Sequence, residues 1–80
     1  MIKIYNTRGV CSQRIEIEME KGVIKKVTFV GGCSGNTQGV SKLVAGMEPH
    51  KVISLLRGIR CGSKSTSCPD QLARALEELQ

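Results

Sequence analysis

The residues of this 80-residue chain best suited to chemistry are its four cysteines, Cys11, Cys33, Cys61 and Cys68. Cysteine thiolates bind zinc or iron–sulfur clusters, and they exchange disulfides. Six residues separate Cys61 from Cys68, a spacing typical of neither a zinc finger nor the C-x-x-C of thioredoxin-like proteins. The spacing alone therefore leaves metal binding, two structural disulfides and plain burial of small apolar side chains as open interpretations.

Compartment bears on this choice. The first residues, 1–8, alternate polar and apolar side chains and include no long apolar run. We therefore expect neither a signal peptide nor a transmembrane helix, and we expect a cytoplasmic protein. Because cytosolic thiols stay reduced, this favours metal binding or redox chemistry over structural disulfides.

The other polar residues do not suggest catalysis. The chain has one histidine, His50, which we expect at the surface, and no nucleophile–base pair is evident. Its net charge is +5, but Tyr5 and Phe29 are its only aromatic residues. With so few stacking platforms, nucleic acid is not an expected partner. We do not expect an enzyme that acts on its own.

The first half of the sequence predicts strands. Residues 2–4 alternate, and residues 15–20 alternate Ile, Ile and Met with three Glu, which predicts a strand with an acidic outer face. Lys21-Gly22 is a turn signal, and residues 23–30 form the partner strand, with Lys opposite Glu.

The second half predicts three helices. Asn36 is the expected N-cap of the first and Gly46 its end, with a buried stripe of Val40, Leu43, Val44 and Met47. The second runs from Pro49 to about Gly58, and the third starts at Pro69 with a buried stripe of Leu72, Ala75, Leu76 and Leu79. Strands followed by helices predict a single α+β domain over residues 1–80, with an antiparallel three-stranded sheet and about three helices on one face.

This arrangement places the cysteines. With the turn at Lys21-Gly22, Cys11 faces position 32, so Cys11 and Cys33 become neighbours at the open end of the hairpin. Cys33 and Cys68 precede helices, whose N-termini favour thiolates. The exposed face of the sheet leaves dimerisation open as an alternative.

Residues 66–70 read Thr-Ser-Cys-Pro-Asp, and with the cysteine layout they make the chain resemble the TSCPD domain family. That family includes small stand-alone four-cysteine proteins and a domain near the C-terminus of adenosylcobalamin-dependent ribonucleotide reductases. The resemblance implies metal binding and a link to ribonucleotide reductase. The chain is too short to hold that enzyme's barrel, radical cofactor and nucleotide sites.

A looser resemblance is to U-type iron–sulfur cluster scaffold proteins. It rests on Gly9-Val10-Cys11, on residues 29–34 (Phe-Val-Gly-Gly-Cys-Ser) and on Cys68 at a helix start. It implies that Cys11, Cys33 and Cys68 converge on one site. Where the scaffolds carry Asp and His, however, this chain has Gln13 and Ser67, and it adds Cys61. A fourth thiolate favours a closed four-thiolate zinc site.

Three functions follow from these patterns. The first is a zinc-binding module with Cys11, Cys33, Cys61 and Cys68 as ligands, accessory to or derived from ribonucleotide reductase. The second is an iron–sulfur scaffold or carrier that works with the cluster assembly machinery. The third is a thiol–disulfide partner of ribonucleotide reductase that uses Cys61 and Cys68 as a redox pair.

Overall fold

The computed structural model describes residues 2–7, 12–31, 34–60, 62 and 64–78. The strands pair antiparallel in the order β1-β2-β3. The elements in chain order are β1 (Ile2–Asn6), β2 (Ser12–Glu20), β3 (Val23–Gly31), α1 (Ser34–Val44), α2 (Pro49–Leu56) and α3 (Cys68–Glu78). The expected α+β architecture, a three-stranded sheet followed by three helices, is confirmed.

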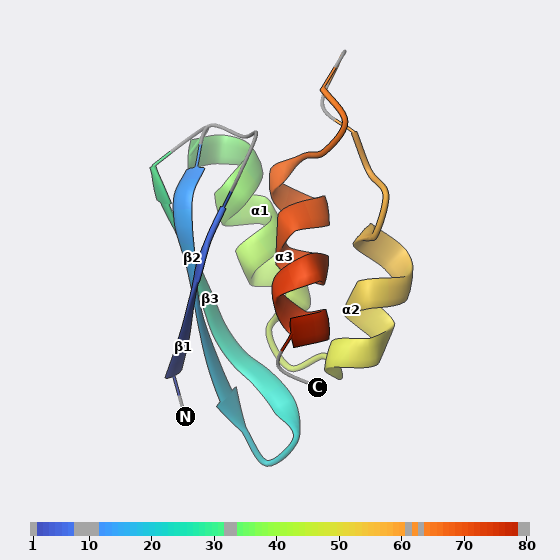
Figure 1. Ribbon diagram of the computed structural model, residues 1–80. Coiled ribbons are helices and arrows are strands. Elements are labelled where there is room, and N and C mark those ends of the chain that lie inside the picture. The colour runs from blue at the N-terminus through green and yellow to red at the C-terminus, as the bar shows by residue number, and fades with distance from the viewer. Residues whose placement is uncertain (1, 8–11, 32–33, 61, 63, 79–80) are drawn as a thin grey trace.

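The helices all lie on one side of the sheet (Figure 1). α1 packs on β3, and α3 contacts β2 and α1. α2 packs on α3, on the side away from the sheet (Figure 1). No helix in the described part of the chain is long and apolar enough to cross a membrane.

The β2–β3 hairpin closes at the predicted turn. Lys21 and Gly22 both have positive φ, 54° and 80°, and Glu20 pairs with Val23 across them. Positive φ at both central residues is typical of the two-residue turns that match the right-handed twist of a hairpin. The turn therefore fixes which residues of β2 and β3 face each other.

The register of this hairpin shifts twice. One irregularity lies between Ser12 and Arg14 and the other between Glu18 and Met19. They offset each other, so the open end still pairs Ser12 with Gly31, which is the register expected from the turn. The expected pair of Cys11 and position 32 lies outside the described residues.

The core lies between the sheet and the helices. The isoleucines of β2 are fully buried, while Glu16 and Glu18, which alternate with them, face outward and are half-buried. Ile24 and Val27 of β3 complete the sheet side of the core. The helices contribute Val44, Val52, Leu72, Ala75 and Leu76.

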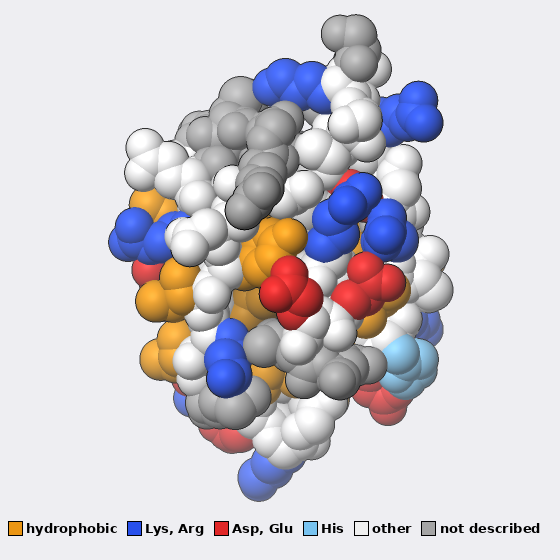
Figure 2. Space-filling model, in the orientation of Figure 1, with side chains coloured by type: hydrophobic (Ala, Val, Ile, Leu, Met, Phe, Trp, Pro, Cys, Tyr) orange, Lys and Arg blue, Asp and Glu red, His pale blue; other side chains and the backbone are white. Residues whose placement is uncertain are grey.

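β1 forms as expected, but its isoleucines lie on the outer face. Ile2 and Ile4 pair with Glu18 and Glu16 and are 65% and 63% exposed. Tyr5, on the opposite face, packs against the core. In Figure 2 apolar side chains accordingly reach the surface along the side of the molecule where the sheet lies.

Two expectations for α1 are wrong. The helix begins at Ser34, so Asn36 lies inside its first turn and is not the N-cap. Leu43 is 78% exposed, whereas Val44 is buried and Val40 packs against the core. α1 rests mainly on one neighbour, β3, and a narrow contact leaves an adjacent residue such as Leu43 in water. Gly46, with φ of 86°, follows the helix end as expected.

Candidate metal centre

Only one of the four predicted ligands lies in the described part of the structure. Cys68 is the first residue of α3 and is half-buried. Cys11, Cys33 and Cys61 lie outside the described residues. Among the described residues, no group of three or more His, Cys, Asp and Glu side chains could hold a metal ion. His50 is exposed on α2 and pairs with Glu48, its Nε2 lying 3.3 Å from a carboxylate oxygen.

The chain segments next to the cysteines do come together. β2 begins at Ser12, directly after Cys11, and β3 ends at Gly31, two residues before Cys33. These strand ends pair with each other. The starts of α1 and of α3 lie at this same end of the molecule, at the top of Figure 1. We refer to this region as the cysteine end.

Ser67 caps the helix that Cys68 begins. Its Oγ accepts a hydrogen bond from the backbone N–H of Asp70 at 3.1 Å, and its carbonyl accepts one from the N–H of Gln71 at 2.8 Å. The hydroxyl of Ser67 also donates to the carbonyl of Ile59 at 2.7 Å. The cap satisfies helix N–H groups that would otherwise lack partners. It also ties the start of α3 to the chain that follows α2.

The carboxylate of Asp70 is fully buried in the first turn of α3. It accepts hydrogen bonds from the backbone N–H of Gly58 at 2.6 Å, the hydroxyl of Thr66 at 2.5 Å and Nε of Arg74 at 2.9 Å. Nη1 of Arg57 lies 3.6 Å from the same carboxylate. We call these five residues the Asp70 cluster.

The outer part of the Asp70 cluster reaches the surface. Arg57 also contacts Glu77, with 2.9 Å between Nε and the carboxylate oxygen. Blue and red side chains lie side by side over the α2–α3 part of the surface in Figure 2. The buried carboxylate is therefore linked to solvent through two half-exposed arginines.

The contacts of Asp70 oppose the effect of its burial on its pKa. Burial by itself would raise the pKa, because it disfavours the charged form. Hydrogen bonds from Thr66, Gly58 and Arg74, with the charge of Arg74, outweigh burial and hold the pKa below its ordinary value of 3.8. Asp70 is thus ionised at neutral pH.

The Asp70 cluster joins the two ends of one loop. Gly58 lies at the start of the segment that carries Cys61, and Thr66 lies at its end. Both donate to the same carboxylate. Because Asp70 lies in the first turn of α3, two residues after Cys68, the cluster holds both ends of the Cys61 loop at the helix start that Cys68 occupies.

The TSCPD domain family model matches residues 3–80. The chain belongs to the TSCPD domain family. No curated protein and no solved structure matches it. The resemblance to U-type iron–sulfur scaffolds therefore rests on the sequence pattern alone.

The structure gives physical roles to the residues that name the TSCPD domain. Thr66 donates to Asp70, Ser67 caps α3, and Asp70 binds both ends of the loop. Three of the five named positions thus hold the Cys68-bearing end of α3 in place. From the sequence, Asp70 had no role beyond its place in the Thr-Ser-Cys-Pro-Asp motif, and the helix was expected to start one residue late, at Pro69. The capping pattern Ser-x-x-Asp and the i,i+4 spacing to Arg74 were the signals available.

Proposed function

We propose that this protein is a small metal-binding module whose thiolates, from Cys11, Cys33, Cys61 and Cys68, hold one zinc ion. The proposal rests above all on one observation: the described neighbours of these cysteines lie at the same end of the molecule. Cys11 directly precedes Ser12, Cys33 lies two residues after Gly31, and these two strand ends pair with each other. Cys68 begins α3 at the same end (Figure 1).

The Asp70 cluster supports including Cys61 in the site. Because one carboxylate binds both Gly58 and Thr66, the two ends of the segment between them lie close together. The sequence between these points carries Cys61. A loop closed in this way beside Cys68 suits two ligands on one ion.

The donor set fits zinc. Four thiolates in tetrahedral arrangement are typical of structural zinc sites, whereas carriers of exchangeable clusters keep weaker ligands. Zinc would add folding free energy to a domain of 80 residues, a size at which an apolar core alone gives modest stability. In this role the metal is structural, and the chain's own residues supply no reaction step.

The family membership supports a proposal about where the module acts and with which enzyme. TSCPD domains resemble the C-terminal domain of adenosylcobalamin-dependent ribonucleotide reductases, so we propose a cytoplasmic protein that is accessory to such an enzyme or derived from it. Binding of the module to a reductase, measured by calorimetry, tests this part of the proposal separately from the metal.

Anaerobic purification followed by analysis of zinc, iron and sulfide, with a visible spectrum, tests the metal. We expect about one zinc per chain and no colour. Cys68→Ser should lower the zinc content, and His50→Ala, which removes an exposed side chain on α2, should leave it unchanged.

Other outcomes contradict the zinc proposal in distinct ways. Iron with acid-labile sulfide and visible absorption would assign the thiolates to an iron–sulfur cluster. A metal-free protein that forms a reversible disulfide between Cys61 and Cys68 would instead assign them to thiol–disulfide exchange.

A further inference from the structure

One edge of β3 pairs with no other strand of the sheet. β3 is an edge strand, because the sheet order is β1-β2-β3. An edge strand presents unpaired backbone N–H and C=O groups along one side, and another extended chain can pair with them. None of the described residues along this edge is one of the four proposed zinc ligands.

The chain already pairs with this edge at one point. The N–H of Ile24 donates to the carbonyl of Met47 at 2.9 Å, and the N–H of Gly46 donates to the carbonyl of Ile24 at 2.6 Å. The segment after α1 therefore lies against the start of β3 as a short strand would. Over Val27–Phe29, by contrast, no described segment makes backbone hydrogen bonds to the free edge.

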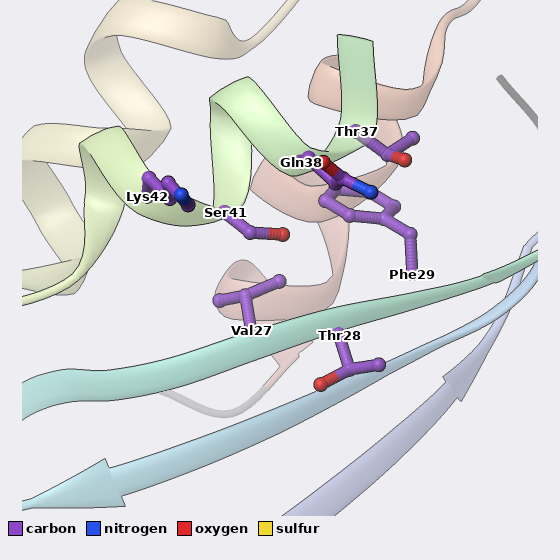
Figure 3. A pocket seen from close by; sticks show the side chains of 7 residues that line it. All are labelled: Val27, Thr28, Phe29, Thr37, Gln38, Ser41 and Lys42. Carbon is purple, nitrogen blue, oxygen red and sulfur yellow. The ribbon is translucent and has the colours of Figure 1, made fainter. Parts of the chain in front are cut away.

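A groove runs along this unpaired stretch, between β3 and α1 (Figure 3). Its volume is about 330 Å³, at the lower end of the range for ligand-binding clefts. Val27 and Phe29 point from the strand toward the helix, and Thr28 points to the other face (Figure 3). The helix wall carries Gln38, Ser41 and Lys42.

The charge of the α1–β3 groove selects the kind of occupant. Lys42 is the one charged residue among the described residues that line it, and no salt bridge of Lys42 occurs in the described part of the structure. An occupant with a carboxylate would supply the missing counter-charge. A second copy of this chain, placed edge to edge, would instead bring positive charge to positive charge, since each chain carries +5.

We propose that the α1–β3 groove binds an extended acidic peptide segment of a partner protein, which adds to β3 as a fourth strand. Backbone hydrogen bonds to Val27–Phe29 supply affinity, as in other cases of strand addition. Apolar side chains of the peptide rest on Val27 and Phe29, and an Asp or Glu pairs with Lys42. The proposal goes beyond the metal-binding function, and neither depends on the other.

Selection from a library of random linear peptides, with the full-length protein immobilised as purified, tests this proposal. We expect enrichment of peptides that alternate apolar residues with Asp or Glu. On titration of the labelled protein, the best peptide should shift the backbone amide signals of residues 27–29 and 38–42 and should show strand-like contacts with β3.

Two matched variants separate the groove from general charge attraction. Lys42→Glu should weaken binding of the selected peptide by up to about fivefold, as for the loss of one exposed ion pair. Lys51→Glu, the same charge change at an exposed position on α2, should leave its affinity nearly unchanged. Replacing the peptide's acidic residue by Lys should restore binding to Lys42→Glu.

Three results would overturn the proposal. The first is no enrichment of any peptide. The second is binding that perturbs residues outside the groove or that responds equally to the two lysine variants. The third is a dimer, detected by light scattering, whose subunits pair through β3, because the edge would then belong to a second copy.

Discussion

Two clusters of carboxylates and cations in this molecule differ in one respect, burial. Asp70 is fully buried and accepts hydrogen bonds from three donors. On the β2–β3 hairpin, Nζ of Lys25 lies 3.3 Å from carboxylate oxygens of both Glu18 and Glu20, and its side chain is 56% exposed. We call the latter the Lys25 cluster.

The two clusters contribute differently to stability, because water competes for the charged groups of only the exposed one. In the Lys25 cluster, solvent hydrates the charges whether or not they pair, so pairing contributes little free energy. Its carboxylates raise the pKa of Lys25, chiefly because the ammonium group donates hydrogen bonds to Glu18 and Glu20. The carboxylate of Asp70 has left water, so each lost donor leaves a buried group unsatisfied. Buried polar contacts therefore stabilise the cysteine end, whereas the exposed ion pairs add little to the stability of the hairpin.

Asp70→Asn should produce the largest effect. It keeps the size of the side chain but removes the charge, and its amide N–H₂ group would face donors. We expect a loss of about 3 kcal/mol in the free energy of unfolding, toward the lower end for a broken buried pair because both arginines still reach water. Urea denaturation measures it. Glu77→Gln, which alters only the exposed partner of Arg57, should change stability by less than about 0.5 kcal/mol.

Acid should produce a related but smaller loss. The folded-state pKa of Asp70 lies below its ordinary value, so the folded protein binds this proton less readily than the unfolded chain does. The stability contributed by Asp70 is fully present above the unfolded pKa and is lost as pH falls through the folded pKa. The difference in stability between wild type and Asp70→Asn should therefore shrink from pH 7 toward strong acid. A constant difference would show that folding leaves the pKa of Asp70 unchanged.

Thr66→Val should cost less again, about 1 to 2 kcal/mol. The hydroxyl donates to Asp70 and accepts from Nε2 of Gln71 at 3.0 Å, and valine offers neither contact in a buried position. Thermal unfolding followed by circular dichroism measures the change. Thr28→Val, the same substitution on the outer face of β3, serves as the control and should stay within about 0.5 kcal/mol. Equal effects at the two positions would show that the buried hydrogen bonds of Thr66 add no stability beyond that of a threonine on the outer face of the sheet.

Lys25→Gln should have the smallest effect on urea denaturation, no larger than that of an ordinary surface substitution, and the effect should fall further in high salt. Lys26→Gln is the matched control, because Lys26 is exposed and forms no salt bridge among the described residues. If Lys25→Gln cost as much as Thr66→Val, exposed and buried clusters would contribute alike and the comparison would fail.

The strands and the hairpin register were predictable from the sequence. Alternation in residues 15–20 and the Lys21-Gly22 turn depend on local geometry, which sets the side-chain period and the residues that face each other. The stripe of α3 was predictable for the same reason, since Leu72, Ala75 and Leu76 are all buried. The fourth expected member, Leu79, lies outside the described residues. Leu43 was wrongly placed in the core, because the depth of contact between α1 and β3 decides which positions are buried. The starts of α1 and α3 were placed late, because helix ends are set less sharply by the sequence than helix interiors.

The candidate site was predictable only in part. The sequence placed Cys68 at a helix start, and the structure agrees. The expected ligands Cys11, Cys33 and Cys61 lie outside the described residues, so the four-thiolate site stays a prediction. The link between Gly58 and Asp70 spans 12 residues and depends on how α2 packs on α3, which no local pattern specifies.

The sequence by itself determined the element types, the hairpin register and the donor chemistry, because residue identity and short-range backbone preferences fix all three. Tertiary structure alone decided that Ile2 and Ile4 face solvent, that the Asp70 carboxylate is buried and fully hydrogen-bonded, and that β3 keeps a free edge beside α1. Each of these depends on which surfaces meet when the helices pack on the sheet. That packing reflects the balance of burial over the whole chain, and no single segment encodes it.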